Sequence, residues 1–89
     1  MSLVEEADEV VALVHAIELF LAGRASEVQG AALADLLAMW LAGHVVRGDP
    51  KATEAYREKV LELHLDGVRR LIPVNYATRI EPKLRRSQQ

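Results

Sequence analysis

The chain has 89 residues, which is enough for one small domain. Apolar residues make up 51% of it and aromatic residues only 4%, so Ala, Leu and Val must supply most of the core, a composition that favours helices. The formal net charge of −2 gives no reason to expect a general nucleic-acid-binding surface, and the absence of cysteine excludes disulfides and thiolate metal sites.

The first predicted helix covers residues 3–22. Ser2 and Glu5 have the S-x-x-E spacing of a capping box, and Gly23 marks the end of the segment. Apolar side chains recur along it at heptad-like spacing, at Leu3, Ala7, Val10, Val14, Ile17 and Leu21. This pattern predicts a helix that packs one narrow face against a core.

The second predicted helix covers residues 27–46, after a second possible capping box at Ser26 and Gln29 and before Gly48. One side is bulky and ends at Trp40 and His44. The opposite side holds small residues together with one acid and one methionine, namely Ala31, Asp35, Ala38, Met39 and Ala42. Small residues at this spacing permit close helix approach, so these five are interface candidates.

Asp35 itself has three interpretations. The simplest is an exposed carboxylate at the rim of a helix contact, because charged side chains are seldom fully buried. The alternatives are a buried, paired structural carboxylate and a catalytic acid in a cleft.

The third predicted helix covers residues 50–72, with Asp49 as its N-cap and Pro50 at its first position. We expect Pro73 to stop it, because proline cannot continue the helical hydrogen bonds. Its apolar arc is wider than a three-helix unit needs, which predicts a second subunit. The interface candidates on this helix are Tyr56, Leu61, Leu65 and Val68.

These elements predict an all-α fold. Short loops favour antiparallel neighbours, so we expect a small three-helix domain over residues 1–72. Residues 73–89 contain two prolines and few apolar side chains, which predicts an extended, partly mobile C-terminal arm.

The most apolar window, residues 30–46, contains Asp35 and His44 and lies at the short limit for a bilayer span. An acid at its centre would cost roughly 2.5–3.5 kcal/mol on insertion. The acidic N-terminal segment argues against a secretory signal. We therefore expect a soluble, cytoplasmic protein with no membrane partner.

Few side chains suggest chemistry. His44, His64 and Glu18 provide a possible two-histidine, one-carboxylate metal set, although no metal-binding spacing supports it and ordinary core or rim histidines are much the better explanation of the first two. Ser2 and Ser26 are used as caps, and no phosphate-binding glycine loop occurs. The sequence therefore predicts no cofactor and no catalytic residue, and argues against an enzyme.

The charges are divided along the chain. Residues 1–30 carry six acids and one base, whereas residues 69–86 carry six bases and one acid. The bases Arg79, Lys83, Arg85 and Arg86 are nucleic-acid candidates, because such side chains contact phosphates. We expect a homodimer or higher homo-oligomer that acts as a protein–protein interaction or assembly module. The alternatives are nucleic-acid association through the basic arm and a metal-dependent enzyme with a His/carboxylate site.

Overall fold

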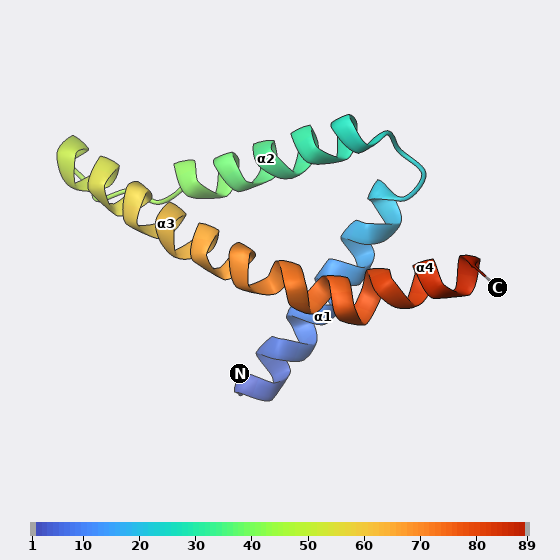
Figure 1. Ribbon diagram of the computed structural model, residues 1–89. Helices are drawn as coiled ribbons and strands as arrows, with labels where there is room; N and C mark the ends of the chain where they lie inside the picture. The colour runs from blue at the N-terminus through green and yellow to red at the C-terminus, as the bar shows by residue number, and fades with distance from the viewer. Residues whose placement is uncertain (1, 89) are drawn as a thin grey trace. The chain divides into compact units, whose positions relative to one another are not determined.

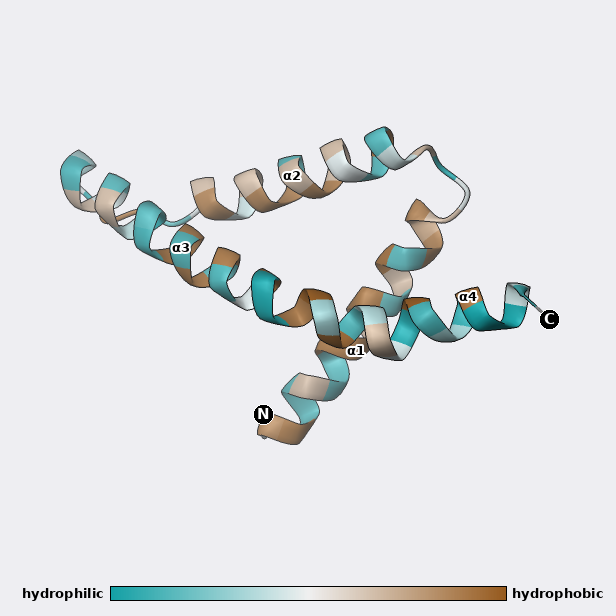
Figure 2. Ribbon diagram, viewed as in Figure 1, coloured by the Kyte–Doolittle hydropathy of each residue, from teal (hydrophilic) through white to brown (hydrophobic). Residues whose placement is uncertain are grey.

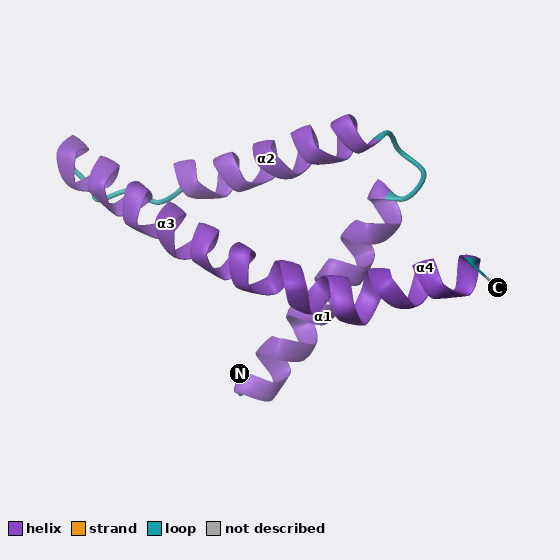
Figure 3. Ribbon diagram, in the orientation of Figure 1, coloured by secondary structure: helices purple, strands orange, loops and turns teal. Residues whose placement is uncertain are grey.

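The computed structural model describes residues 2–88, which are almost entirely helical (Figure 1). The elements, in order, are α1 (Leu3–Leu21), α2 (Ser26–Ala42), α3 (Pro50–Asn75), the π-helical turn η1 (Tyr76–Ile80) and α4 (Glu81–Ser87). The described residues contain no strand (Figure 3). The predicted all-α class is confirmed.

The chain divides into two compact units, Met1–Leu37 and Ala38–Gln89, with the boundary inside α2. The first unit contains α1 and most of α2. The second contains the end of α2 and everything that follows. The expected antiparallel arrangement of three helices, and the division into domains at residue 72, stay predictions.

Local signals set the starts of α1 and α3. The Ser2 hydroxyl accepts a hydrogen bond from the Glu5 amide at 3.2 Å, and the Asp49 carboxylate accepts one from the Ala52 amide at 2.9 Å. Each bond satisfies an amide that the first turn of a helix leaves without a partner. Gly23 and Gly48 have φ angles of 77° and 74°, a conformation that glycine adopts without strain. The predicted starts of α1 and α3 and the predicted end of α1 before Gly23 are confirmed.

The start of α2 differs from the expected reciprocal capping box. The helix begins at Ser26, and the Gln29 backbone N–H donates to the Ala25 carbonyl at 3.0 Å instead of to the Ser26 hydroxyl. The Gln29 side chain donates instead to the carbonyls of Leu21, at 2.8 Å, and Arg24, at 3.1 Å. Gln29 therefore ties the end of α1 and the loop after it to α2, and it adds a second hydrogen bond to the Leu21 carbonyl, which also accepts from the Arg24 amide.

The expected end of α2 near Val46 is wrong, because the helix ends at Ala42. Groups from α3 take the backbone bonds that a longer helix would form. Arg57 donates to the carbonyls of Ala42 and His44, and Thr53 exchanges two hydrogen bonds with the backbone of Val46.

The extended conformation expected for the C-terminal arm is also wrong. Helix α3 continues through Pro73 to Asn75, and η1 and α4 follow without a break in helical backbone, as Figure 1 shows. The Tyr76 amide donates to the carbonyls of both Ile72 and Pro73, and the Thr78 hydroxyl donates to the Val74 carbonyl at 2.8 Å. The turn widens just after the proline, so the chain remains helical despite the missing amide. Residue 89 of the expected arm lies outside the described residues.

Neither unit buries a large apolar side chain. Among residues 2–88 the only buried residue is Thr53, with 8% of its surface exposed. Apolar and polar residues alternate along α1, α2 and α3 (Figure 2). The apolar faces predicted from the sequence are therefore present, but they remain largely exposed within each unit.

Candidate functional site

Four rings gather in the second unit, where the end of α2 meets the first half of α3. The Trp40 ring lies 4.5 Å from the His44 ring, edge to face, and 4.6 Å from the His64 ring. The Tyr56 ring lies 5.4 Å from that of His44. These spacings are typical of favourable aromatic pairs. We call these four residues the ring cluster.

The two imidazoles are held in the same way. His44 Nδ1 lies 2.9 Å from the Trp40 carbonyl, and His64 Nδ1 lies 3.2 Å from the Val60 carbonyl. A carbonyl can only accept, so Nδ1 carries the hydrogen in each ring. In the neutral form Nε2 then keeps a lone pair that can accept a hydrogen bond or bind a metal.

Two side chains on the first turns of α3 hold the segment that carries His44. Arg57 donates from Nη2 to the Ala42 carbonyl at 2.6 Å and from Nε to the His44 carbonyl at 3.1 Å. The Thr53 hydroxyl donates to the Val46 carbonyl at 3.1 Å and accepts from the Val46 amide at 2.9 Å. Because Thr53 and Arg57 are four residues apart, they lie on one face of α3, and this face holds the segment between α2 and α3 by hydrogen bonds.

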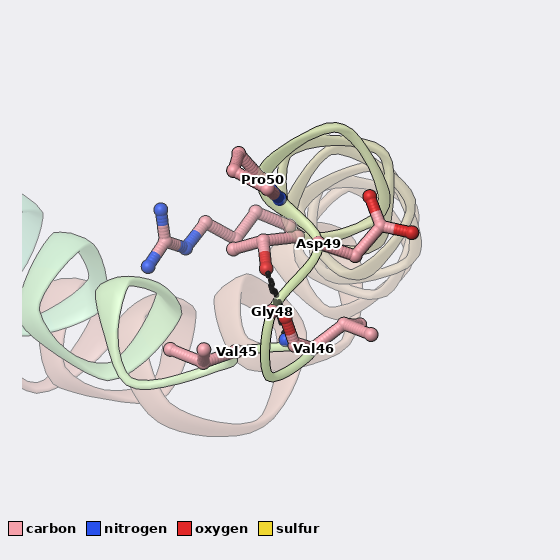
Figure 4. A pocket seen from close by; sticks show the side chains of 7 residues that line it. Val45, Val46, Gly48, Asp49 and Pro50 are labelled. Atoms are coloured by element: carbon pink, nitrogen blue, oxygen red, sulfur yellow. Dashed lines mark hydrogen bonds between the residues drawn. The ribbon is translucent and has the colours of Figure 1, made fainter.

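The same connection borders an open hollow of about 400 Å³ (Figure 4). Its lining residues are Val45, Val46, Gly48, Asp49, Pro50, Thr53 and Arg57. The hydroxyl of Thr53, the guanidinium of Arg57 and the carboxylate of Asp49 all hydrogen-bond to backbone groups. The polar groups of the hollow therefore hold the turn together.

Comparisons with known proteins found none that is similar to this chain. No protein-family model, no curated protein and no solved structure matches it. The function must be argued from its own residues.

The metal candidates divide between the two units. His44 and His64 both lie against Trp40, in the second unit, whereas Glu18 lies on α1, in the first. Among residues 2–88, no group of three or more histidine, cysteine, aspartate or glutamate side chains is arranged to hold a metal ion.

The interface candidates of α2 are exposed. Ala31 and Asp35 belong to the first unit, and Ala38, Met39 and Ala42 to the second. Asp35 is exposed within its own unit, so burial gives no reason to assign it as a catalytic acid. Its expected role at a helix contact stays a prediction.

The interface candidates of α3 are covered to different degrees. Tyr56 contributes to the ring cluster but is 43% exposed, Leu61 and Leu65 are half-buried, and Val68 is 49% exposed. The candidates in the middle of α3 are therefore less exposed than the one further towards its C-terminus.

The nucleic-acid candidates lie on helical backbone. Arg79 is in η1, and Lys83, Arg85 and Arg86 are in α4. Arg85 forms an ion pair with Glu81, one helical turn earlier. This pair neutralises one of the bases that the sequence offered for phosphate contacts.

Sequence reasoning missed Thr53 and Arg57, although they fix the connection between α2 and α3. Their four-residue spacing was visible, but it resembles any exposed pair on a helix. Only their contacts with the carbonyls and the amide of residues 42–46 distinguish them.

Among residues 2–88, no helix has both the length and the apolar character to cross a bilayer.

Proposed function

We propose that the protein is a homo-oligomeric assembly module whose apolar helix faces are covered by a second copy. The observation that carries the proposal is the lack of any buried large apolar side chain among residues 2–88. Ordering each residue costs about 1–2 kcal/mol of backbone entropy, and burial of apolar surface is the main term that offsets this cost. Helices with so little burial need further contacts to remain ordered.

The faces in question have the spacing that helix pairing requires. On α1 the apolar positions recur with a heptad-like period, and on α3 they extend from the half-buried Leu61 and Leu65 to the exposed Val68 and Ile72. Burying one such side chain contributes about 1.5–3 kcal/mol. A few residues per face would therefore supply the stability of a small domain.

The division of charge supports association between copies of the same chain. Residues 1–30 carry a net charge of −5, from six acids and one base, and residues 69–86 carry +5, from six bases and one acid. The acidic segment of one copy can therefore lie beside the basic segment of another, which makes opposite charges adjacent in an interface between identical chains.

Two double variants test the proposal by light scattering at micromolar concentration. Val68→Gln with Ile72→Gln makes the apolar face of α3 polar, and we expect it to lower the molar mass towards that of the monomer. Asp66→Gln with Arg70→Gln is the matched control, because it places two glutamines on the opposite side of α3 and leaves the net charge unchanged. We expect the control to keep the oligomer, since an exposed ion pair contributes only about 0.2–1 kcal/mol. Unmodified protein that is a monodisperse 9.9 kDa monomer would end the proposal.

A second candidate function is nucleic-acid binding through η1 and α4. The observation in its favour is that the helical backbone holds Lys83 and Arg86 three residues apart on α4, on neighbouring positions of one face. Binding of this kind weakens steeply with salt. Lys83→Gln with Arg86→Gln should then abolish a low-salt gel shift of duplex DNA, and unchanged binding by this variant would reject the candidate.

A further inference from the structure

One apolar stripe runs along α3, η1 and α4, and we propose that a second copy of this chain packs on it in antiparallel orientation. The inference rests on the proposed homo-oligomer and specifies its surface and direction. The stripe consists of Leu61, Leu65, Val68, Ile72, Tyr76, Ile80 and Leu84.

The π-helical turn keeps this stripe on one side of the helix. In an uninterrupted α-helix the eight residues from Ile72 to Ile80 turn through about 800°, which would leave Ile80 roughly 80° out of line. A π-turn holds about one more residue than an α-turn, so η1, which begins at Tyr76, returns Ile80 to within roughly 20° of Ile72. Leu84 follows one α-helical turn later. The widened turn therefore aligns α4 with α3 along a single face.

Most of the stripe has no cover in its own unit. The end of α2 reaches along α3 as far as His64, the farthest ring contact. Leu61 and Leu65 are accordingly half-buried. Beyond them Val68, Ile72, Tyr76, Ile80 and Leu84 are between 46% and 61% exposed. The exposed part begins where the contact with α2 stops.

The net charges of the helical segments that carry the stripe indicate what covers it. Residues 58–66 hold three acids and one base, a net charge of −2, whereas residues 69–86 hold six bases and one acid, a net charge of +5, counted over all sides of the helix. An antiparallel copy places the basic segment of each chain beside the acidic segment of the other. A parallel copy would place two segments of charge +5 side by side, which like-charge repulsion disfavours. A chain that carries both segments can meet its own copy in this way.

The antiparallel arrangement fixes which positions meet. The midpoint between Leu61 and Leu84 falls next to Ile72, so the two Ile72 side chains lie at the two-fold axis. Leu84 lies twelve residues further on, so the two Leu84 positions are about 36 Å apart at 1.5 Å of rise per residue. Each Leu84 instead lies opposite Leu61 of the other copy.

Cysteine cross-linking distinguishes these positions cleanly, because the chain contains no cysteine of its own. The variants are Ile72→Cys, Leu61→Cys, Leu84→Cys and, as a control on the opposite side of α3, Arg70→Cys. Each is oxidised in air and examined on a non-reducing gel, and a disulfide requires Cα atoms no more than about 7 Å apart.

We expect Ile72→Cys to form at least about fivefold more covalent dimer than either Leu84→Cys or Arg70→Cys. An equimolar mixture of Leu61→Cys and Leu84→Cys should form a mixed dimer. Self-cross-linking of Leu84→Cys as strong as that of Ile72→Cys would overturn the orientation. An oligomer by light scattering in which Ile72→Cys does not exceed Arg70→Cys would overturn the surface but leave the proposed function intact. A monomer by light scattering would overturn both.

Discussion

Thr53 offers the sharpest test of how the second unit is held together. It is the one buried residue among residues 2–88, and its hydroxyl both donates to and accepts from the backbone of Val46. Replacing it with valine keeps the shape and the β-branch but removes the hydroxyl, so the Val46 amide loses its partner and the Val46 carbonyl keeps only the bond from the Asp49 amide. Thr53→Ser is the matched control, because it keeps the hydroxyl and removes only one methyl group.

The expected costs follow from these contacts. Two hydrogen bonds of about 0.5–1.5 kcal/mol each are lost in Thr53→Val, so the free energy of unfolding should fall by about 1–3 kcal/mol. Thr53→Ser loses the burial of one methyl group, which costs about 0.8 kcal/mol. For a chain of this length each kcal/mol lowers the Tm by about 4–8 °C. Thr53→Val should therefore melt several degrees below Thr53→Ser.

Thermal and urea unfolding can be followed through Trp40, the single tryptophan, which lies in the same unit as Thr53. Protein concentration must be held constant between variants, because the stability of an oligomer depends on it. If Thr53→Val is as stable as the unmodified protein, or more stable than Thr53→Ser, the hydroxyl does not hold the connection between α2 and α3.

Two further predictions concern the ring cluster and the proline in α3. His44→Ala should lower the free energy of unfolding by about 1–2 kcal/mol, since it removes ring contacts with both Trp40 and Tyr56, whereas His64→Ala removes one and should cost about half as much in the same urea titration. Equal costs would contradict the observed packing. Pro73→Ala should stabilise the protein by about 1–3 kcal/mol and leave the helical circular dichroism signal nearly unchanged, because the backbone there is already helical and the new amide can donate to the Arg69 carbonyl. A large rise in the helical signal would show that residues 73–88 are not helical in the unmodified protein.

The sequence was a good guide wherever a boundary depends on its nearest neighbours. The caps at Ser2 and Asp49 and the glycine at 23 act within one turn, and the structure has them as predicted. Pro73 misled for the opposite reason. Its missing amide is a local penalty, and a widened turn that continues the helix is not visible in any local pattern.

The candidate site was less predictable because it depends on contacts between elements. The sequence placed His44 and His64 on helix faces, but their shared contact with Trp40 requires the end of α2 to lie against α3. The end of α2 at Ala42 has the same origin, since Arg57 lies fifteen residues away in sequence. Periodicity describes one helix at a time and cannot choose among such partners.

Sedimentation equilibrium of the unmodified chain tests the central claim most directly. If copies of the chain cover the apolar faces of its helices, the molar mass at micromolar concentration is at least twice 9.9 kDa and falls on dilution. A mass of 9.9 kDa that is independent of concentration would contradict the account.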